Sequence, residues 1–463
     1  MKKTPNRVIL INVLCTALLN GISMIMMPIY SSMLGTDNYG LASIYTTWSS
    51  VFSIIIGLQT ASSLAVSQKD FKKEEQLSYQ SNSIYIGVIM TALMMVICLI
   101  FIKPLSNFLN IPSWSVLILC PHAFGIFCVG FLNSKFTYEF KQEKNLLVSV
   151  GMSVGAAAFS VALITIFPPE YAYMGKVIGG AIPQMLCGLL LVAFYIRKVG
   201  FQFNRVYVKY AMAYGTPLIF SNLCILLFES SDKLMLQRMQ SNSAVGIYTL
   251  AFNFSAILSS IWYALNHAWG PFYFRYEAEK NDEAILTHAR NIARLFSVLS
   301  TGFLLLAPEF FRIFSDSAFW SGDTLIPIFA IGYYANYIRC FAVNHQYCYK
   351  KTKAISAVSI GSAVLNIVLN AILIPKYGVY GAAVATAMAN IASMLACWYT
   401  AKRCVSKDRR FPLTYKTFLP YAVLFCVGVM LFPLKSFWWI RWLLGALIGL
   451  LQLRHIWKEK QIF

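Results

Sequence analysis

Fourteen apolar windows follow one another along this chain of 463 residues. The hydrocarbon core of a bilayer is about 30 Å thick, and a helix crosses it in roughly 20 residues. Only 12% of the residues are charged, compared with about 25% in an average soluble domain. The sequence therefore predicts an all-α polytopic membrane protein with fourteen transmembrane helices, and argues against a soluble enzyme, a disordered scaffold or a disulfide-rich secreted domain. The windows are 8–33, 41–66, 82–102, 112–134, 146–167, 172–196, 209–229, 243–269, 287–311, 324–346, 354–375, 377–401, 416–433 and 437–453.

Basic residues are distributed unevenly between the two sides that these spans define. The chain has 38 Lys and Arg against 18 Asp and Glu, a net charge of +20. With both termini in the cytoplasm, 29 of the 38 lie in cytoplasmic segments, as the positive-inside rule predicts. This bias explains most of the charge, so we expect membrane lipids rather than nucleic acid as its counterpart. Lys176 and Arg339 lie inside windows, and the seven on the outer side are Lys103, Lys233, Arg238, Arg312, Lys376, Lys435 and Arg441.

No motif indicates a catalytic or metal cofactor. The 11 cysteines are scattered through apolar runs without a CxxC pair, which is typical of packing roles. His122, His267 and His345 lack metal-ligand spacing, and no GxxxxGK[ST] motif is present. The longest polar segments, near 67–81 and 271–286, leave no room for an extramembrane catalytic domain. We therefore expect no enzymatic activity and no cofactor, with a proton or sodium gradient as the possible energy source.

The two halves of the chain resemble each other at an offset near 206 residues. Residues 39–41 match 245–247, and Pro168 matches Pro375. Such matches predict two pseudo-symmetric six-helix lobes, the parallel-repeat arrangement of alternating-access transporters. Two further matches pair Gly175 with Gly378 and residues 148–151 with 358–361. The predicted division is 1–205 for the first lobe, 206–404 for the second, and 405–463 for two appended helices.

The segment from Asn366 to Thr386 resembles the eleventh-to-twelfth helix signature of polysaccharide flippases, which belong to the multidrug/oligosaccharidyl-lipid/polysaccharide exporter superfamily. Residues 28–40, 231–248 and 269–271 agree with it. The resemblance implies transport of an undecaprenyl-pyrophosphate-linked oligosaccharide from the inner to the outer leaflet of a bacterial inner membrane. Such a substrate would be an O-antigen, capsule or exopolysaccharide repeat unit, and polysaccharide polymerase or assembly proteins are possible partners.

Arg339 is the candidate for a pyrophosphate contact. It lies inside the window 324–346, where a central arginine costs about 2.5–3.5 kcal/mol on insertion scales. Asn336 is one turn away on the same face. A structural ion pair, for example with Glu229, or extension of the side chain toward the cytosol remains an alternative.

Arg290 and Arg294 are four residues apart at the cytoplasmic start of the window 287–311, so both lie on one helix face. They are suited either to collecting an anionic headgroup from the inner leaflet or to anchoring the helix. Lys176 is also a candidate substrate contact, although its position near the outer end of its window favours extension toward the interface.

Polar residues at helical spacing predict cavity walls. Asn12 in the window 8–33, and Trp262 and Asn266 in the window 243–269, are expected to face sugars. The serines and threonines of the window 41–66 favour close helix packing instead.

Glu229 is the candidate site for coupling to protons or sodium, since it is an ionisable residue near the outer end of the window 209–229. Glu309 has a similar position in the window 287–311. One alternative is a cation-coupled multidrug antiporter of the same superfamily, which is disfavoured because no acidic residue lies deep in a first-lobe window. A second is a membrane-integral glycan polymerase or ligase, which would be expected to carry a long external loop. The resemblance extends to lipid-linked peptidoglycan precursor flippases, but those have a more cationic first-lobe cavity.

Overall fold

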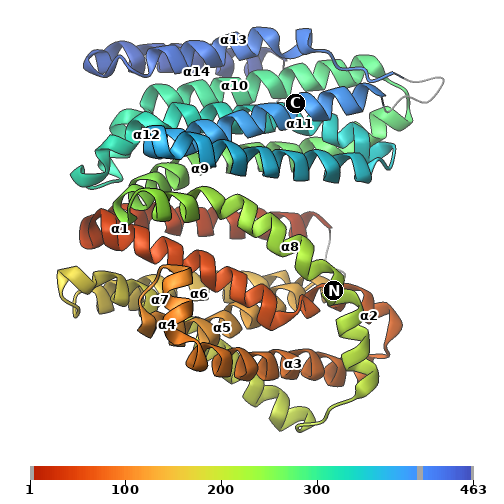
Figure 1. Ribbon diagram of the computed structural model, residues 1–463. Coiled ribbons are helices and arrows are strands. Elements are labelled where there is room, and N and C mark those ends of the chain that lie inside the picture. The colour runs from red at the N-terminus through yellow and green to blue at the C-terminus, as the bar shows by residue number, and fades with distance from the viewer. Residues whose placement is uncertain (1–4, 404–409, 460–463) are drawn as a thin grey trace. The chain divides into compact units, whose positions relative to one another are not determined.

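The computed structural model describes the backbone of residues 5–403 and 410–459. Side chains are described over the same ranges except at 5–10, 12–13, 227–228, 436, 453 and 455–459. Every regular element in the described ranges is helical, which confirms the all-α prediction (Figure 1). The helices form two compact units, residues 1–246 and 247–463.

The first unit is built around the long helix α1 and the helices that follow it. α1 is interrupted at Gly35, where φ is 65° and ψ is 177°, so it contains two helical runs. It packs against α5, α6 and α7, and α6 packs closely on α7. The elements are α1 (Pro5–Gly57), η1 (Thr60–Ser63), α2 (Leu64–Asp70), α3 (Lys73–Ile100), α4 (Ile102–Leu109), α5 (Ser113–Tyr138), α6 (Gln142–Ile164), η2 (Pro169–Tyr171), α7 (Ala172–Val199) and α8 (Arg205–Met239).

The second unit contains the remaining helices. α11 packs along α12, while α10 packs against α13 and α14 (Figure 1). An aromatic core joins α10, α11 and α13: the Phe296 and Tyr337 rings lie 4.2 Å apart, as do those of Tyr334 and Phe425. The elements are α9 (Asn242–Ala278), which begins at the end of the first unit, α10 (Asp282–Ile313), η3 (Ser317–Leu325), α11 (Ile326–Cys348), α12 (Thr352–Arg403), α13 (Tyr415–Leu431), η4 (Lys435–Phe437) and α14 (Trp438–Glu459).

Two boundaries differ from the predicted windows. The window 41–66 stops at Gly57, because Leu58 and Gln59 adopt positive φ angles of 43° and 54°. The break expected at Pro375 lies at Gly378, where φ is 54° and ψ is −129°. Pro375 is accommodated within α12, whereas the turn needs a positive φ that glycine adopts without a Cβ clash.

Glycines bring paired helices into close contact in both units. A Cβ added at Gly179 of α7 would lie 2.4 Å from Ser160 Cα of α6. In the second unit, a Cβ at Gly381 would lie 2.3 Å from the carbonyl oxygen of Leu373, on the preceding half of α12. Small residues allow such backbone approach in membrane helices.

Nine helices in the described residues are long and apolar enough to cross a membrane, and the bent α8 makes ten. This confirms a multi-pass membrane protein, while the count of fourteen stays a prediction. The compact units divide at residue 246, so α8 packs with the first unit, on α1 and α3. The predicted repeat boundary between 205 and 206 concerns sequence similarity rather than packing, and also stays a prediction.

Candidate functional site

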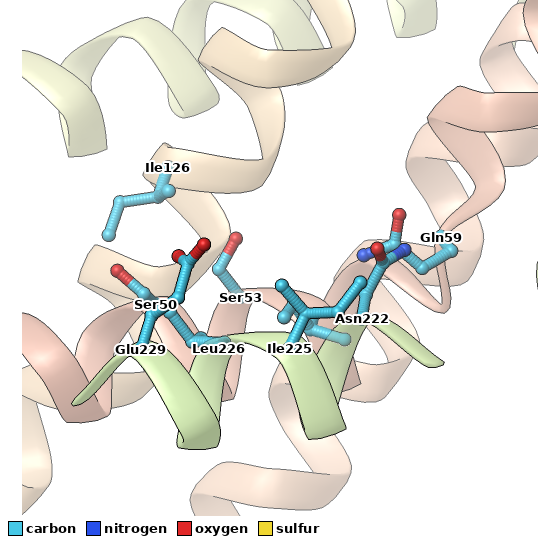
Figure 2. A pocket seen from close by; sticks show the side chains of 9 residues that line it. Ser50, Ser53, Gln59, Ile126, Asn222, Ile225, Leu226 and Glu229 are labelled. Atoms are coloured by element: carbon cyan, nitrogen blue, oxygen red, sulfur yellow. The ribbon is translucent and has the colours of Figure 1, made fainter. Parts of the chain in front are cut away.

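The first unit contains an open cavity of about 310 Å³ between α1, α5 and α8, with a mainly apolar lining and a few polar groups (Figure 2). Its polar groups are two serines of α1, an amide on the following turn, and an amide and a carboxylate of α8. Apolar side chains separate these groups, so the cavity can accept a small polar or charged ligand at a few points. The lining residues are Ser50, Ser53, Ile54, Gln59, Ile126, Asn222, Ile225, Leu226 and Glu229.

Glu229 is the charged residue among those that line this cavity. Its carboxylate rises from α8 beside the Ser50 side chain (Figure 2). The two parts of α8, Arg205–Leu226 and Glu229–Met239, are bent by 53°, and Glu229 begins the second part. Lys233 follows one helical turn later and interacts with Glu229 electrostatically. A carboxylate among hydroxyl and amide groups is an arrangement that can exchange a proton or hold a small cation.

The polar stripe of the window 41–66 has two roles. Ser50 and Ser53 line the cavity, and the Ser50 hydroxyl donates to the carbonyl of Thr46 at 3.1 Å. Gly57 instead packs on the Phe127 ring, and Thr60 is buried. The packing expected for this stripe therefore applies to its end, whereas its middle faces a cavity.

Lys176 is held inside the first unit. Its Nζ lies 3.0 Å from the centroid of the Tyr30 ring, which belongs to α1. The Ser160 hydroxyl donates to the carbonyl of Lys176 at 3.3 Å. The amine is therefore engaged by an aromatic face rather than extended away from the bundle, and this contact favours a structural role. The side chain of Asn12, the other first-lobe candidate, lies outside the described residues.

Arg339 and Asn336 lie on α11 in the second unit. Asn336 donates through Nδ2 to Oδ1 of Asn390 on α12 at 3.1 Å. Arg339 is half-buried; its Nε is buried without a hydrogen-bond partner, and no described carboxylate pairs with it. Its electrostatic neighbours include the thiols of Cys340 and Cys397.

Arg290 and Arg294 differ although they lie one turn apart on α10. Arg290 is exposed. Arg294 is half-buried, its Nε has no hydrogen-bond partner, and no described carboxylate pairs with it. The structure therefore distinguishes Arg294 and Arg339, on two adjacent helices, as half-buried cations that no described carboxylate neutralises.

The two candidates on α9 are already engaged within the second unit. Trp262 is only 5% exposed, and its ring packs edge-on against Tyr337 at 5.9 Å. Asn266 accepts a hydrogen bond from Asn344 of α11 at 2.9 Å. In this conformation Trp262 is part of the aromatic core, while the side-chain amide of Asn266 is paired with that of Asn344.

Two ion pairs attach η4 and α14 to the rest of the second unit, and the sequence analysis did not predict either pair. Arg441 of α14 pairs with Glu309 of α10 and donates to the carbonyl of Leu305 at 3.0 Å. Lys435 pairs with Asp323 at 2.6 Å. Glu309 is thus neutralised by an arginine. One sequence feature could have indicated these ion pairs: Lys435 and Arg441 are among the few cations on the outer side, where the positive-inside rule disfavours them.

Comparison with known proteins gives two family matches that together cover most of the chain. Residues 7–277 match the family described as polysaccharide biosynthesis protein, and residues 276–452 match that of the lipid II flippase MurJ. A relative from Haemophilus influenzae, Lsg locus putative protein 1, is 23% identical over 366 residues, which cover 74% of this chain and 84% of the relative.

Solved structures show the same fold at low sequence identity. The inward closed conformation of lipid II flippase MurJ gives a TM-score of 0.72 at 15% identity and covers 98% of this chain and 99% of its own. An inward-facing multidrug resistance MATE family transporter of the MOP superfamily gives 0.58 at 16% identity and covers 84% of this chain and 94% of its own.

Proposed function

Since the chain belongs to the polysaccharide biosynthesis protein family, a family of membrane transporters, we propose that it flips an undecaprenyl-pyrophosphate-linked oligosaccharide from the inner to the outer leaflet of a bacterial inner membrane. The H. influenzae relative and the MurJ likeness support a lipid-linked cargo. We further propose cytoplasmic termini and fourteen spans, counting each half of α1 and α12, the bent α8, and the shorter α13 and α14.

The observation that carries this proposal is a pair of half-buried arginines in the second unit that no described carboxylate neutralises. Arg441 also leaves its Nε without a partner, but Glu309 neutralises its charge. Arg294 and Arg339 have no such carboxylate among the described residues. A partly buried cation without a counter-charge is costly, and a cation within a membrane segment usually faces a cavity, a partner or a ligand. A pyrophosphate supplies the missing negative charge and several acceptors for guanidinium hydrogen bonds.

The remaining candidates receive subordinate roles in this proposal. Arg290, exposed at the start of α10, attracts the headgroup before Arg294 binds it. The amide pairs of Asn336 and Asn266 offer donors and acceptors that rearrange toward sugar hydroxyls when the substrate enters. Such groups matter because neither charge nor unpaired hydroxyls can enter hydrocarbon without compensation. Trp262 and Asn12 contribute to the glycan path in a second conformation of the transport cycle.

Glu229 gives the transporter a means of coupling to an ion gradient. A proton or sodium ion that binds at Glu229 neutralises the carboxylate inside the first-unit cavity and changes its attraction to Lys233. The bend of α8 lies at this residue, so binding there would bias the helix between two shapes. The Glu229→Gln variant should retain substrate binding but lose dependence on the gradient, and unchanged dependence would exclude Glu229 from coupling.

The proposal is tested by glycan export in cells that express Arg339→Gln or Arg294→Gln. Both variants should insert at normal abundance, export less glycan, and accumulate lipid-linked precursor on the inner leaflet. Arg312→Gln is the matched control, since Arg312 lies at the end of α10 against the Trp320 ring. Normal export by both test variants would remove these arginines from the substrate path.

A multidrug antiporter is the second candidate, because the fold also matches a MATE family transporter. Efflux of cationic drugs by purified protein in vesicles, without any effect on glycan export in cells, would favour it over the flippase.

A further inference from the structure

A second, widely open hollow of about 700 Å³ lies along one face of the first half of α8, and all of its lining residues belong to that helix. Its residues recur at three- and four-residue spacing, so they form one continuous strip of the helix. The strip extends about 18 Å from Arg205 to Pro217, at 1.5 Å per residue. The lining residues are Arg205, Val208, Lys209, Met212, Ala213, Thr216 and Pro217.

The opposite face of α8 is fixed to the first unit. Tyr207 is buried, and its ring meets that of Phe71 edge-on at 5.1 Å. The Tyr210 hydroxyl donates to Oδ2 of Asp70 at 2.7 Å. These contacts fix the rotation of α8 within the first unit, so the strip lies on the face of the helix that points away from them.

Charge is concentrated at one end of this strip. Arg205 and Lys209 lie one turn apart in the first two turns of α8, and both are exposed. No described carboxylate pairs with either, and Asp70 accepts a hydrogen bond from Tyr210 instead. The helix N-terminus, capped by Asn204, adds positive potential at the same end. The remainder of the strip is apolar except for Thr216. A ligand that fits it has an anionic head and an apolar chain.

We propose that this hollow is the inner-leaflet docking site for the lipid part of the substrate. At this docking step, which precedes binding by Arg294 and Arg339, the pyrophosphate binds Arg205 and Lys209. The first isoprene units lie against Val208, Met212, Ala213 and Pro217. This inference rests on the proposed function and adds a recognition site for the carrier rather than for the glycan. Because the site contacts only the pyrophosphate and the isoprene units, it accepts the carrier whatever sugars are attached.

The test measures binding of undecaprenyl pyrophosphate without sugars to the full-length protein in nanodiscs. The double variant Arg205→Gln with Lys209→Gln should bind roughly tenfold more weakly, since each charge-assisted contact contributes substantially. The control, Arg197→Gln with Lys198→Gln, removes the same charge from exposed residues at the end of α7 and should bind like the wild type. Thr216→Trp fills the far end of the hollow. It should weaken binding of undecaprenyl pyrophosphate but not of isopentenyl pyrophosphate, which has a single isoprene unit.

Four results would overturn the site. Equal losses in the test and control double variants would reduce it to general attraction of anions. Competition by phosphatidylglycerol at the same concentration as the pyrophosphate carrier would assign the hollow to ordinary anionic lipid. Unchanged binding by the test variants, in a protein whose wild type exports glycan, would refute the hollow and leave the proposed function intact. A wild type that neither binds the carrier nor exports glycan would refute both.

Discussion

The ion pair between Arg441 and Glu309 supports a quantitative prediction about how α14 is held. The Arg441 side chain is 1% exposed and that of Glu309 is 27% exposed. In the Glu309→Ala variant, Arg441 keeps only the carbonyl of Leu305 as a partner. Breaking a buried pair from one side costs about 3–5 kcal/mol, because the other charge stays buried without compensation. The Leu305 hydrogen bond persists, so we expect a loss near the lower end, about 3 kcal/mol of the free energy of unfolding.

The measurement is unfolding by SDS titration in mixed micelles, followed by circular dichroism. Glu279→Ala is the control, since Arg275 and Glu279 form the same kind of pair at 2.9 Å with side chains 70% and 48% exposed. An exposed pair of this kind contributes roughly 0.3–0.5 kcal/mol. Replacing both buried partners, Arg441→Met with Glu309→Leu, should restore stability to within about 1 kcal/mol of the wild type. If Glu309→Ala costs no more than Glu279→Ala, the charge of Arg441 is not buried as described and the reasoning fails.

Three further changes test the packing of the two units. Gly179→Leu should destabilise the protein by at least about 1–3 kcal/mol through overpacking against α6. Gly180→Leu, which has open space at its Cβ, should not. Equal losses of stability in a thermal-unfolding assay would contradict the close contact at Gly179. Lys176→Met and Tyr30→Leu should show a coupling of about 2 kcal/mol in a double-mutant cycle, as expected for a desolvated cation–π contact, and additive effects would argue against it. Asn370→Leu should cost about 0.6–1.7 kcal/mol by removing its 3.0 Å hydrogen bond to Asn366, and retained stability in the same assay would show that this bond contributes little.

Hydropathy predicted much of the fold because burial in lipid leaves few options for the backbone. An apolar run of bilayer length must satisfy its hydrogen bonds internally, so the windows are largely helical, although α1 and α12 each take up parts of two windows. The pattern is weaker where only a short segment containing proline separates two windows, as between 146–167 and 172–196 and between 354–375 and 377–401. The break at Pro168 is confirmed, since α6 ends at Ile164 and α7 begins at Ala172. The break near Pro375 is displaced to Gly378, because proline can sit within a helix but only glycine adopts the turn easily.

Contacts between distant residues could not be predicted in the same way. The sequence identified Arg339 and Glu229 as unusual because charge in an apolar window is rare. It could not show that Glu309 is neutralised by a residue 132 positions away, or that Trp262 faces Tyr337. Such relations depend on how helices are rotated about their own axes, and that rotation is set by packing rather than by the composition of any one window.

The close glycine contacts at Gly179 and Gly381 have a consequence at the level of the gene. A single-nucleotide change in a glycine codon that alters the amino acid gives alanine, valine, serine, cysteine, arginine, tryptophan, aspartate or glutamate, and every one of these carries a Cβ. Since that atom would lie 2.4 Å or less from neighbouring backbone, no one-step missense change at either codon escapes the clash. In a library of random point mutants selected for glycan export, both codons should therefore retain only silent changes, while the codon for Gly180 tolerates replacement.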